Sequence, residues 1–137
     1  MTIYAVIDTN VLVSALLSKH DNAATVQVLD GLFLKRFIPL LSNEIFQEYS
    51  TVLRRKKFKF SENTVSSLLE VIEIYGEFVT PTPLHIALPD MKDLPFYEVV
   101  MEKHDDNAFL VTGNLKHFPH EPCIVSVHEF LELLNQR

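Results

Sequence analysis

Four polar side chains occupy positions in the sequence from which a folded chain could gather them into one site. They share a place at a strand end, at a helix start or at the border of an apolar helix face: Asp8, Glu48, Asp93 and Asn114. A parallel sheet brings such positions to one edge, where crowded carboxylates repel unless a proton or a cation neutralises them. Oxygen ligands without histidine or cysteine suit Mg²⁺ or Mn²⁺ better than zinc. Such an ion activates water and stabilises a phosphoryl group under attack, so the pattern favours metal-dependent phosphoryl chemistry.

Asp8 directly follows an apolar segment of the sequence. Residues 3–7 are apolar without alternation, which predicts a strand buried on both faces. In open α/β sheets, ligands bind beyond the carboxyl ends of the strands, where Asp8 would stand. The alternative is a helix N-cap, which aspartate often provides. Thr9 or Asn10 could cap the same helix and leave Asp8 for a functional site.

The remaining acids also have ordinary structural alternatives. Glu48 lies roughly 100° from the middle of the apolar stripe of its helix, whereas Glu44 lies roughly 140° away. Glu48 is therefore nearer the buried border, although most helix glutamates are simply solvated. Asp90 and Asp93 could supply oxygens to a cation, but both are also ordinary turn and N-cap residues. Spacing alone leaves both interpretations open.

The apolar pattern predicts an α/β chain. Strands are expected at 3–7, 37–41, 108–112 and 123–125, with a short extended piece at 78–79. Helices are expected at 11–17, 23–30, 43–57 and 61–75, and again after Asp93 and after Ser126. Ser42 is expected to cap the third of these helices, Ser61 to open the fourth, and Ser126 with Glu129 to form a capping box at the last. Two fully apolar strands with helices between them predict a mostly parallel sheet covered on both faces. Pro39 lacks a backbone N–H, so we expect it at a sheet edge or at the start of its strand.

Composition and charge narrow the possible classes of protein. The length of 137 residues and the hydrophobic content of 47% fit one domain, residues 1–137. No segment resembles a membrane span or a signal peptide, and the single Cys123 excludes an internal disulfide, so we expect a cytoplasmic protein. The net charge of −6 argues against broad electrostatic binding of nucleic acid, but not against carboxylates that hold a metal. The basic cluster, Arg54–Lys57 with Lys59, could contact phosphate or could be a solvated helix end.

Four motifs resemble, in order, those of PIN-domain proteins of the VapC-like toxin group found in toxin–antitoxin pairs. They are VIDTNVL at 6–12, SNEIFQEY at 42–49, DMKDLPF at 90–96 and LVTGNLKHF at 110–118. The resemblance spans nearly the whole chain and implies a PIN-like three-layer α/β/α fold with a mostly parallel central sheet. It implies a Mg²⁺- or Mn²⁺-dependent endoribonuclease that hydrolyses phosphodiester bonds of single-stranded or structured RNA. It also implies a homodimer and a small antitoxin protein as partner.

The resemblance assigns a role to each acid. Asp8, Glu48 and Asp93 match the catalytic acids of the family, and the same three residues would hold the metal, with Asp90 as a further ligand. Asn10 and Thr112 match polar positions that support the pocket. Many members carry an aspartate where this chain has Asn114, which becomes a supporting or substrate-binding amide. The exchange removes one charge and leaves enough carboxylates for one ion, so a two-metal mechanism is not implied.

The sequence is also compatible with other functions. A non-catalytic PIN-like module that binds RNA or a protein partner is motivated by Asn114 and the acidic charge. A phosphotransfer domain of the receiver or haloacid-dehalogenase type also places acids at strand ends, but Asn10 stands where the latter needs its second acid. With three glycines and no glycine-rich phosphate loop, a nucleotide-binding Rossmann enzyme is disfavoured. No histidine is assigned a catalytic role, and His117 is expected near the substrate.

Overall fold

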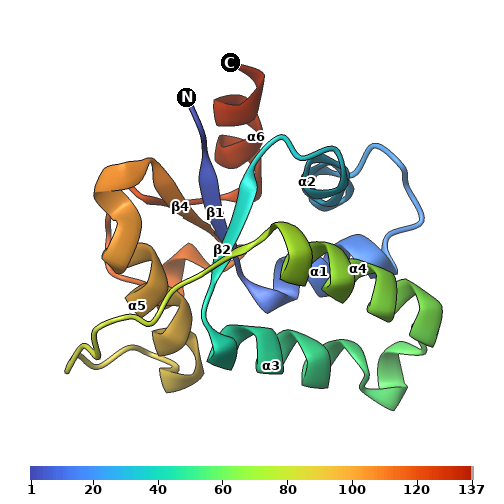
Figure 1. Ribbon diagram of the computed structural model, residues 1–137, viewed down its shortest axis with the longest axis horizontal. Helices are drawn as coiled ribbons and strands as arrows, with labels where there is room; N and C mark the ends of the chain where they lie inside the picture. The colour runs from blue at the N-terminus through green and yellow to red at the C-terminus, as the bar shows by residue number, and fades with distance from the viewer. Residues whose placement is uncertain (137) are drawn as a thin grey trace.

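The computed structural model describes residues 1–136, which form a five-stranded sheet between helices (Figure 1). The strands are β1 (Tyr4–Ile7), β2 (Ile38–Leu41), β3 (Glu77–Phe78), β4 (Ala108–Val111) and β5 (Ile124–Val125). Their order is β3-β2-β1-β4-β5, and every neighbouring pair is parallel. The expected α/β class, with its mostly parallel sheet, is therefore confirmed.

Six α-helices cover the two faces of this sheet. They are α1 (Thr9–Leu17), α2 (Ala24–Phe33), α3 (Asn43–Leu53), α4 (Glu62–Tyr75), α5 (Leu94–Lys103) and α6 (Val127–Asn135). Helix α5 packs against β1, β2 and β4 on one side of the sheet, whereas α1, α2 and α4 lie on the other (Figure 1). Helix α6 packs against α2 and β4. The result is the three-layer α/β/α arrangement.

Strand β1 is the centre of the molecule. Its apolar run predicted burial on both faces, and Ala5 and Val6 are fully buried, as are Leu110 and Val111 of the neighbouring β4. From β1 the chain adds β2 and then β3 on one side, and afterwards crosses to β4 and β5 on the other. This reversal makes the carboxyl end of β1 a topological switch point, where open α/β sheets bind their ligands.

Serine caps begin three of the helices. The hydroxyl groups of Ser42, Ser61 and Ser126 each accept a hydrogen bond from the backbone N–H three residues later, at 3.1 to 3.2 Å. Ser126 and Glu129 complete the expected capping box, since the Glu129 carboxylate accepts from the Ser126 N–H at 2.9 Å. These local signals place the starts of α3, α4 and α6 where the sequence predicted them.

Strand β2 is an interior strand, so an edge position for it was wrong. Ile38 N–H donates to the carbonyl of Ile3, the residue before β1, and alternation along the ladder turns the nitrogen of Pro39 toward β3. Pairing with β3 begins one residue later, at Leu40 opposite Glu77. The missing N–H therefore costs no ladder bond, and Pro39 sits near the strand start, as the other alternative expected.

Helix α3 is shorter than its predicted range of 43–57. It ends at Leu53 with Arg54 as its C-cap, and residues Lys56–Phe58 form a separate 3₁₀ turn. The guanidinium of Arg54 pairs with Glu62 of α4 at 2.9 Å. This exposed pair lowers the pKa of the Glu62 carboxyl to about 2. The basic cluster is thus split, with one of its members tied to the next helix.

Candidate functional site

Asp8 lies at the switch point and is held by its neighbours. Its backbone N–H donates to the Val111 carbonyl at 3.0 Å, and its side chain is 5% exposed. One carboxylate oxygen accepts from the Thr112 hydroxyl at 2.8 Å, and the other accepts weakly from the Asn10 N–H at 3.4 Å. Asp8 is itself the N-cap of α1, so the expectation that Thr9 or Asn10 caps this helix was wrong.

Thr112 and Asn114 form the support beneath Asp8. Thr112 is fully buried; its hydroxyl donates to Asp8 and accepts from the Asn114 backbone N–H at 3.0 Å. This hydrogen-bond chain links the ends of β1 and β4. The Asn114 side chain is exposed and does not line the acidic cavity described below, so the residue acts here through its backbone.

Glu48 is brought to Asp8 by α3. Tyr49 is buried, and its hydroxyl donates to the Ile7 carbonyl at 2.6 Å, which anchors the middle of α3 to the end of β1. Burial, together with the nearby Asp8 and Glu48, raises the pKa of the Tyr49 hydroxyl. The Glu48 carboxylate accepts a short hydrogen bond from the Thr9 hydroxyl at 2.5 Å. Thr9, proposed from sequence only as a cap, thus orients Glu48.

Asp90 and Asp93 enter from the turn before α5. A 3₁₀ turn, Met91–Asp93, begins after Asp90, whose carboxylate accepts from the Lys92 N–H at 3.0 Å. Asp93 is the N-cap residue of α5 but makes no side-chain capping bond. Its carboxylate contacts the His117 ring at Nδ1 instead, at 3.1 Å. A carboxylate free of the capping role is available to the site.

These side chains surround one small cavity of about 140 Å³. It is lined by Asp8, Thr9, Asn10, Glu48, Val52, Arg55, Asp90, Lys92 and Asp93. All four predicted metal-ligating acids therefore face the same space. Arg55 and Lys92 were not predicted as site residues, although Arg55 belongs to the basic cluster and Lys92 stands between two aspartates. Thr112 lies beneath the cavity.

The crowded and partly buried carboxyl groups make this cavity favourable for a cation. Burial raises the pKa of the Asp8 carboxyl above its usual range. Burial also raises the pKa of Asp93, and the charge of Asp8 adds to that rise. A cation between the acids would remove both penalties, and carboxylate oxygens are the ligands that Mg²⁺ prefers.

The side chains are not arranged for simultaneous coordination. Within residues 1–136, no group of three or more His, Cys, Asp or Glu side chains is placed so that it could hold a metal ion. Two of the acids are turned to other partners, Glu48 to Thr9 and Asp93 to His117. The donor chemistry therefore fits a divalent cation, while rotation of these carboxylates is needed to complete its coordination.

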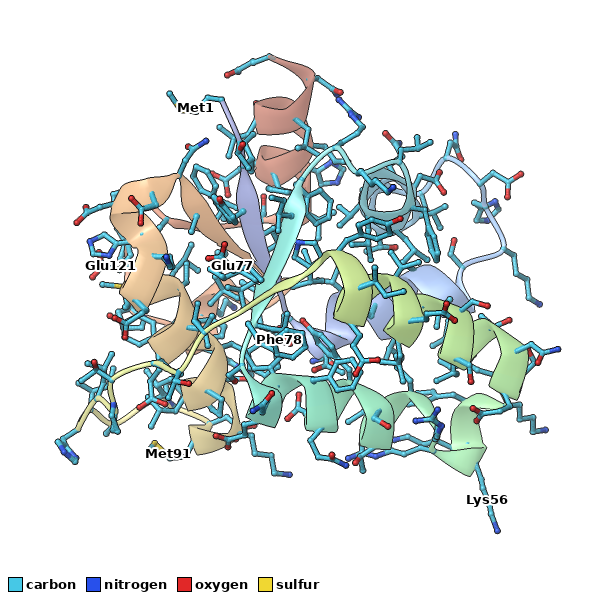
Figure 2. All side chains as sticks on the ribbon, in the orientation of Figure 1. Met1, Lys56, Glu77, Phe78, Met91 and Glu121 are labelled. Atoms are coloured by element: carbon cyan, nitrogen blue, oxygen red, sulfur yellow. The ribbon has the colours of Figure 1, made fainter. Side chains whose placement is uncertain are left out.

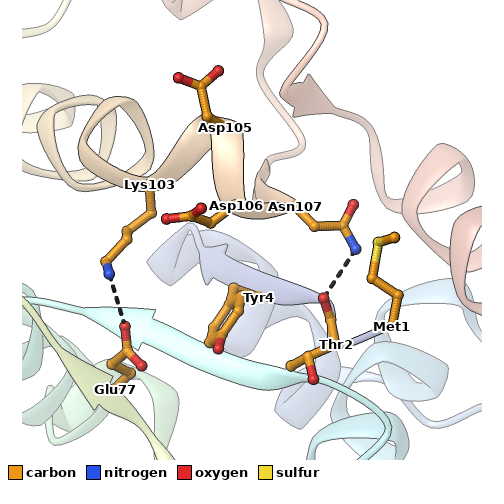
Figure 3. Close-up of a pocket in the computed structure, with 8 residues that line it drawn as sticks. All are labelled: Met1, Thr2, Tyr4, Glu77, Lys103, Asp105, Asp106 and Asn107. Carbon is orange, nitrogen blue, oxygen red and sulfur yellow. Dashed lines mark hydrogen bonds and ion pairs between the residues drawn. The ribbon is translucent and has the colours of Figure 1, made fainter.

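A larger cavity of about 430 Å³ lies at the opposite end of the strands (Figure 3). It is bordered by Tyr4 at the start of β1 and by an ion pair between Lys103 and Glu77 at 3.5 Å. The Asn107 side chain donates to the Thr2 carbonyl across its rim at 2.9 Å. None of the predicted site residues lines it, and it lies at the amino ends of the strands, away from the switch point.

Comparison with known proteins identifies the family. A family model described as a PIN domain matches residues 4–116, and the chain therefore belongs to the PIN-domain family. PIN domains are in general nucleases and typically use divalent metal ions. The curated proteins yield no match, and neither do the solved structures. Among residues 1–136, no helix is both long and apolar enough to cross a membrane.

Proposed function

We propose that this protein is a divalent-metal-dependent endoribonuclease that hydrolyses phosphodiester bonds of single-stranded or structured RNA. The observation that carries the proposal is the convergence of Asp8, Glu48, Asp90 and Asp93 on one cavity at the switch point of the sheet. Membership of the PIN-domain family supports nuclease chemistry. Residues 1–137 would act as one PIN-like domain, since α6, beyond the matched residues, packs on α2 and β4.

Each polar residue of the cavity has a part in this proposal. Asp8, Glu48, Asp90 and Asp93 would hold Mg²⁺ or Mn²⁺. The bound ion supplies Lewis acidity to the phosphoryl oxygens and lowers the pKa of water. Arg55 and Lys92, which line the cavity together with the acids, would bind the phosphate charge of the RNA. A carboxylate of the site would take the proton of the attacking water, and Thr112 would hold Asp8 in place.

The second candidate is a non-catalytic PIN-like module that binds RNA or a protein partner. Two observations favour it: Asn114 stands where many relatives carry an acid, and no three acids of residues 1–136 are placed for coordination. This candidate predicts binding without turnover. The experiment below distinguishes it from the nuclease.

We also propose the biological setting that the resemblance implies. The protein would be a cytoplasmic VapC-like toxin, a homodimer held inactive by a small antitoxin protein. A small gene adjacent to its own would encode that antitoxin. Co-expression of both genes, with affinity purification through the antitoxin, is expected to recover a stable complex in which RNA cleavage is suppressed.

The decisive experiment is cleavage of a mixed-sequence single-stranded RNA by purified protein. Reactions contain Mn²⁺, Mg²⁺ or EDTA, and compare the parent with Asp93→Asn and with Asp21→Asn. Asp21 is exposed in the loop before α2, so its variant makes the same chemical change away from the cavity. We expect metal-dependent cleavage by the parent and by Asp21→Asn, and a loss of about a hundredfold or more in Asp93→Asn.

Each result has a defined meaning. Cleavage that persists in EDTA, or that Asp93→Asn retains in full, would contradict the proposed nuclease site. RNA binding without cleavage under every metal condition would move the non-catalytic module ahead.

A further inference from the structure

A second cavity of about 260 Å³ adjoins the acidic one. It is lined by Glu44, Ile45, Glu48, Met91, Lys92, Pro95 and Phe96. Glu48 and Lys92 line both cavities, so the two spaces are neighbours separated by these side chains. A nucleotide with its phosphate in the acidic cavity therefore has the second cavity beside it as a place for a base.

The second cavity is built by elements that the fold fixes in place. Ile45, in the first turn of α3, is fully buried, and Phe96, in the first turn of α5, is 2% exposed. Met91, labelled at the turn before α5 in Figure 2, is 53% exposed, and its sulfur accepts from the Leu88 N–H at 3.4 Å. The cavity thus combines a rigid apolar floor with an accessible thioether at its rim.

The size and the apolar surfaces suit one flat heterocycle. Its volume lies just below the range of about 300 to 1,000 Å³ that drug-sized ligands occupy. Unpaired bases of single-stranded RNA bind on apolar and aromatic surfaces and present their edges to polar groups. Met91 and the partly exposed Pro95 offer such surfaces here, above the buried Phe96.

The polar groups favour a base that donates hydrogen bonds. Glu44 is exposed, and within residues 1–136 its carboxylate makes no side-chain hydrogen bond or ion pair, whereas Glu48 already accepts from Thr9. A carboxylate with two free oxygens matches adjacent N–H groups. Guanine presents N1–H and N2–H₂ side by side and carries acceptors at O6 and N7 that Lys92 could reach. Uracil presents a single N–H.

We infer that this cavity is a binding subsite for the nucleobase next to the scissile phosphate, with guanine as its preferred base. The inference rests on the proposed ribonuclease function. Glu44 would act as the specificity-determining residue, and Met91 and Pro95 as the surfaces that hold the ring. At this subsite the proposed nuclease would discriminate among RNA sequences.

Methyl NMR tests this subsite without catalysis. The chain contains three methionines, of which Met91 alone lines the cavity, so ¹³C-methyl methionine labelling provides one reporter and two internal references. The labelled protein in EDTA is titrated with each of the four ribonucleoside 5′-monophosphates, and Met91→Leu assigns the reporter. We expect a saturable shift of the Met91 methyl signal, with GMP binding at least about tenfold more tightly than UMP.

Matched variants identify the residue responsible. Glu44→Gln should reduce the GMP preference to about twofold or less, because the amide offers one acceptor in place of two. Glu73→Gln, the same change at an exposed position on α4, should retain the full preference. Equal affinity for GMP and UMP, no shift at Met91, or equal shifts at all three methionines would each overturn the subsite.

The experiments distinguish failure of the proposed subsite from failure of the proposed nuclease. Selective GMP binding in a protein that never cleaves RNA would sustain the subsite and remove the nuclease. Metal-dependent cleavage with no base preference and no Met91 shift would sustain the nuclease and remove the subsite.

Discussion

Asp8 caps a helix and faces the candidate metal cavity with the same carboxylate. Burial raises its pKa in the folded protein, so the folded state holds the Asp8 proton more tightly than the unfolded chain does. The corresponding contribution to stability is fully present below the unfolded pKa and is lost as pH rises through the raised folded pKa. At pH values above that raised pKa, and without metal, the ionised Asp8 therefore weakens the fold. Asp93 contributes with the same sign.

The Asp8→Asn variant should lack this loss of stability, because asparagine carries no charge. Asparagine has one acceptor oxygen, which can keep the bond from the Thr112 hydroxyl and give up the weak 3.4 Å bond from the Asn10 N–H. Because the buried charge is removed at the expense of that weak bond alone, in EDTA at pH 7 we expect a melting temperature equal to or above that of the parent. The loss of parental stability with rising pH should be smaller in the variant. At a hundredfold excess of Mg²⁺ over its dissociation constant, the parent should gain about 2.7 kcal/mol and the variant less. Thermal melts across pH and Mg²⁺ concentration measure both effects; an equal Mg²⁺ gain would exclude Asp8 as a ligand.

At the scale of the elements, the junction between α4 and β3 depends on a residue without a side chain. A Cβ at Gly76 would lie 2.4 Å from the Ile72 carbonyl oxygen and 3.0 Å from a Leu41 methyl group. Gly76 N–H also donates to that same carbonyl at 2.8 Å, which ends α4. The close approach lets the chain turn directly from α4 into the short strand beside β2.

Gly76→Ala should therefore lower the free energy of unfolding by about 1–3 kcal/mol, because backbone atoms of α4 must shift to admit the methyl group. Gly113→Ala is the matched control. Nothing lies within 4 Å of a Cβ there, so its effect should stay within about 0.5 kcal/mol. Urea denaturation of both variants makes the comparison, and equal stabilities would show that the junction relaxes without cost.

What the sequence could predict was local. The caps at Ser42, Ser61 and Ser126 depend on a hydroxyl and an N–H three residues apart, and all three were confirmed. The interior place of β2 was missed because a proline signal does not tell which side of a strand its nitrogen faces. The end of α3 was missed because Arg54 to Lys57 are good helix formers, whereas Arg54 pairs with Glu62 on the next helix.

For the candidate site, too, the sequence indicated single residues but not the contacts between them. Strand ends, helix starts and helix borders singled out Asp8, Glu48, Asp93 and Asn114, and the resemblance to the PIN-domain family added Asp90. The four acids line one cavity, whereas Asn114 does not. The contacts that orient them join residues far apart in sequence, 39 residues for Thr9 with Glu48 and 24 for His117 with Asp93. No periodicity encodes such pairs. The metal-binding and catalytic roles of these acids stay predictions.

At the scale of the whole molecule, the charge balance would limit how the proposed RNA substrate binds. The net charge is −6 and the isoelectric point is about 5.4, so the molecule as a whole repels a phosphate backbone. Arg55 and Lys92 are the cations that line the acidic cavity. We therefore expect binding through few phosphates, concentrated at the site.

The salt dependence of RNA binding measures that number. With two phosphate contacts, the logarithm of the binding constant should fall with the logarithm of salt concentration at a slope of about −1.4. Arg55→Gln should reduce the slope by about 0.7, whereas Lys19→Gln, in the exposed loop after α1, should leave it unchanged. Fluorescence anisotropy with a labelled single-stranded RNA in EDTA provides the measurement. A slope several times steeper would indicate a broad basic surface and contradict this view.

The bond between Thr112 and Asp8 joins residues 104 positions apart. During synthesis, at about 5 to 20 residues per second, Asp8 therefore waits about 5 to 20 seconds for the residue that orients it. Strand β1 also lacks its β4 neighbour for that whole interval. Incomplete nascent chains would consequently contain the α3 residues of the acidic cavity, Glu48 and Val52, but would lack Thr112, which orients Asp8. For the proposed nuclease, translation would thus delay a complete site until the chain is almost finished, so a nascent chain would not cleave the message that encodes it.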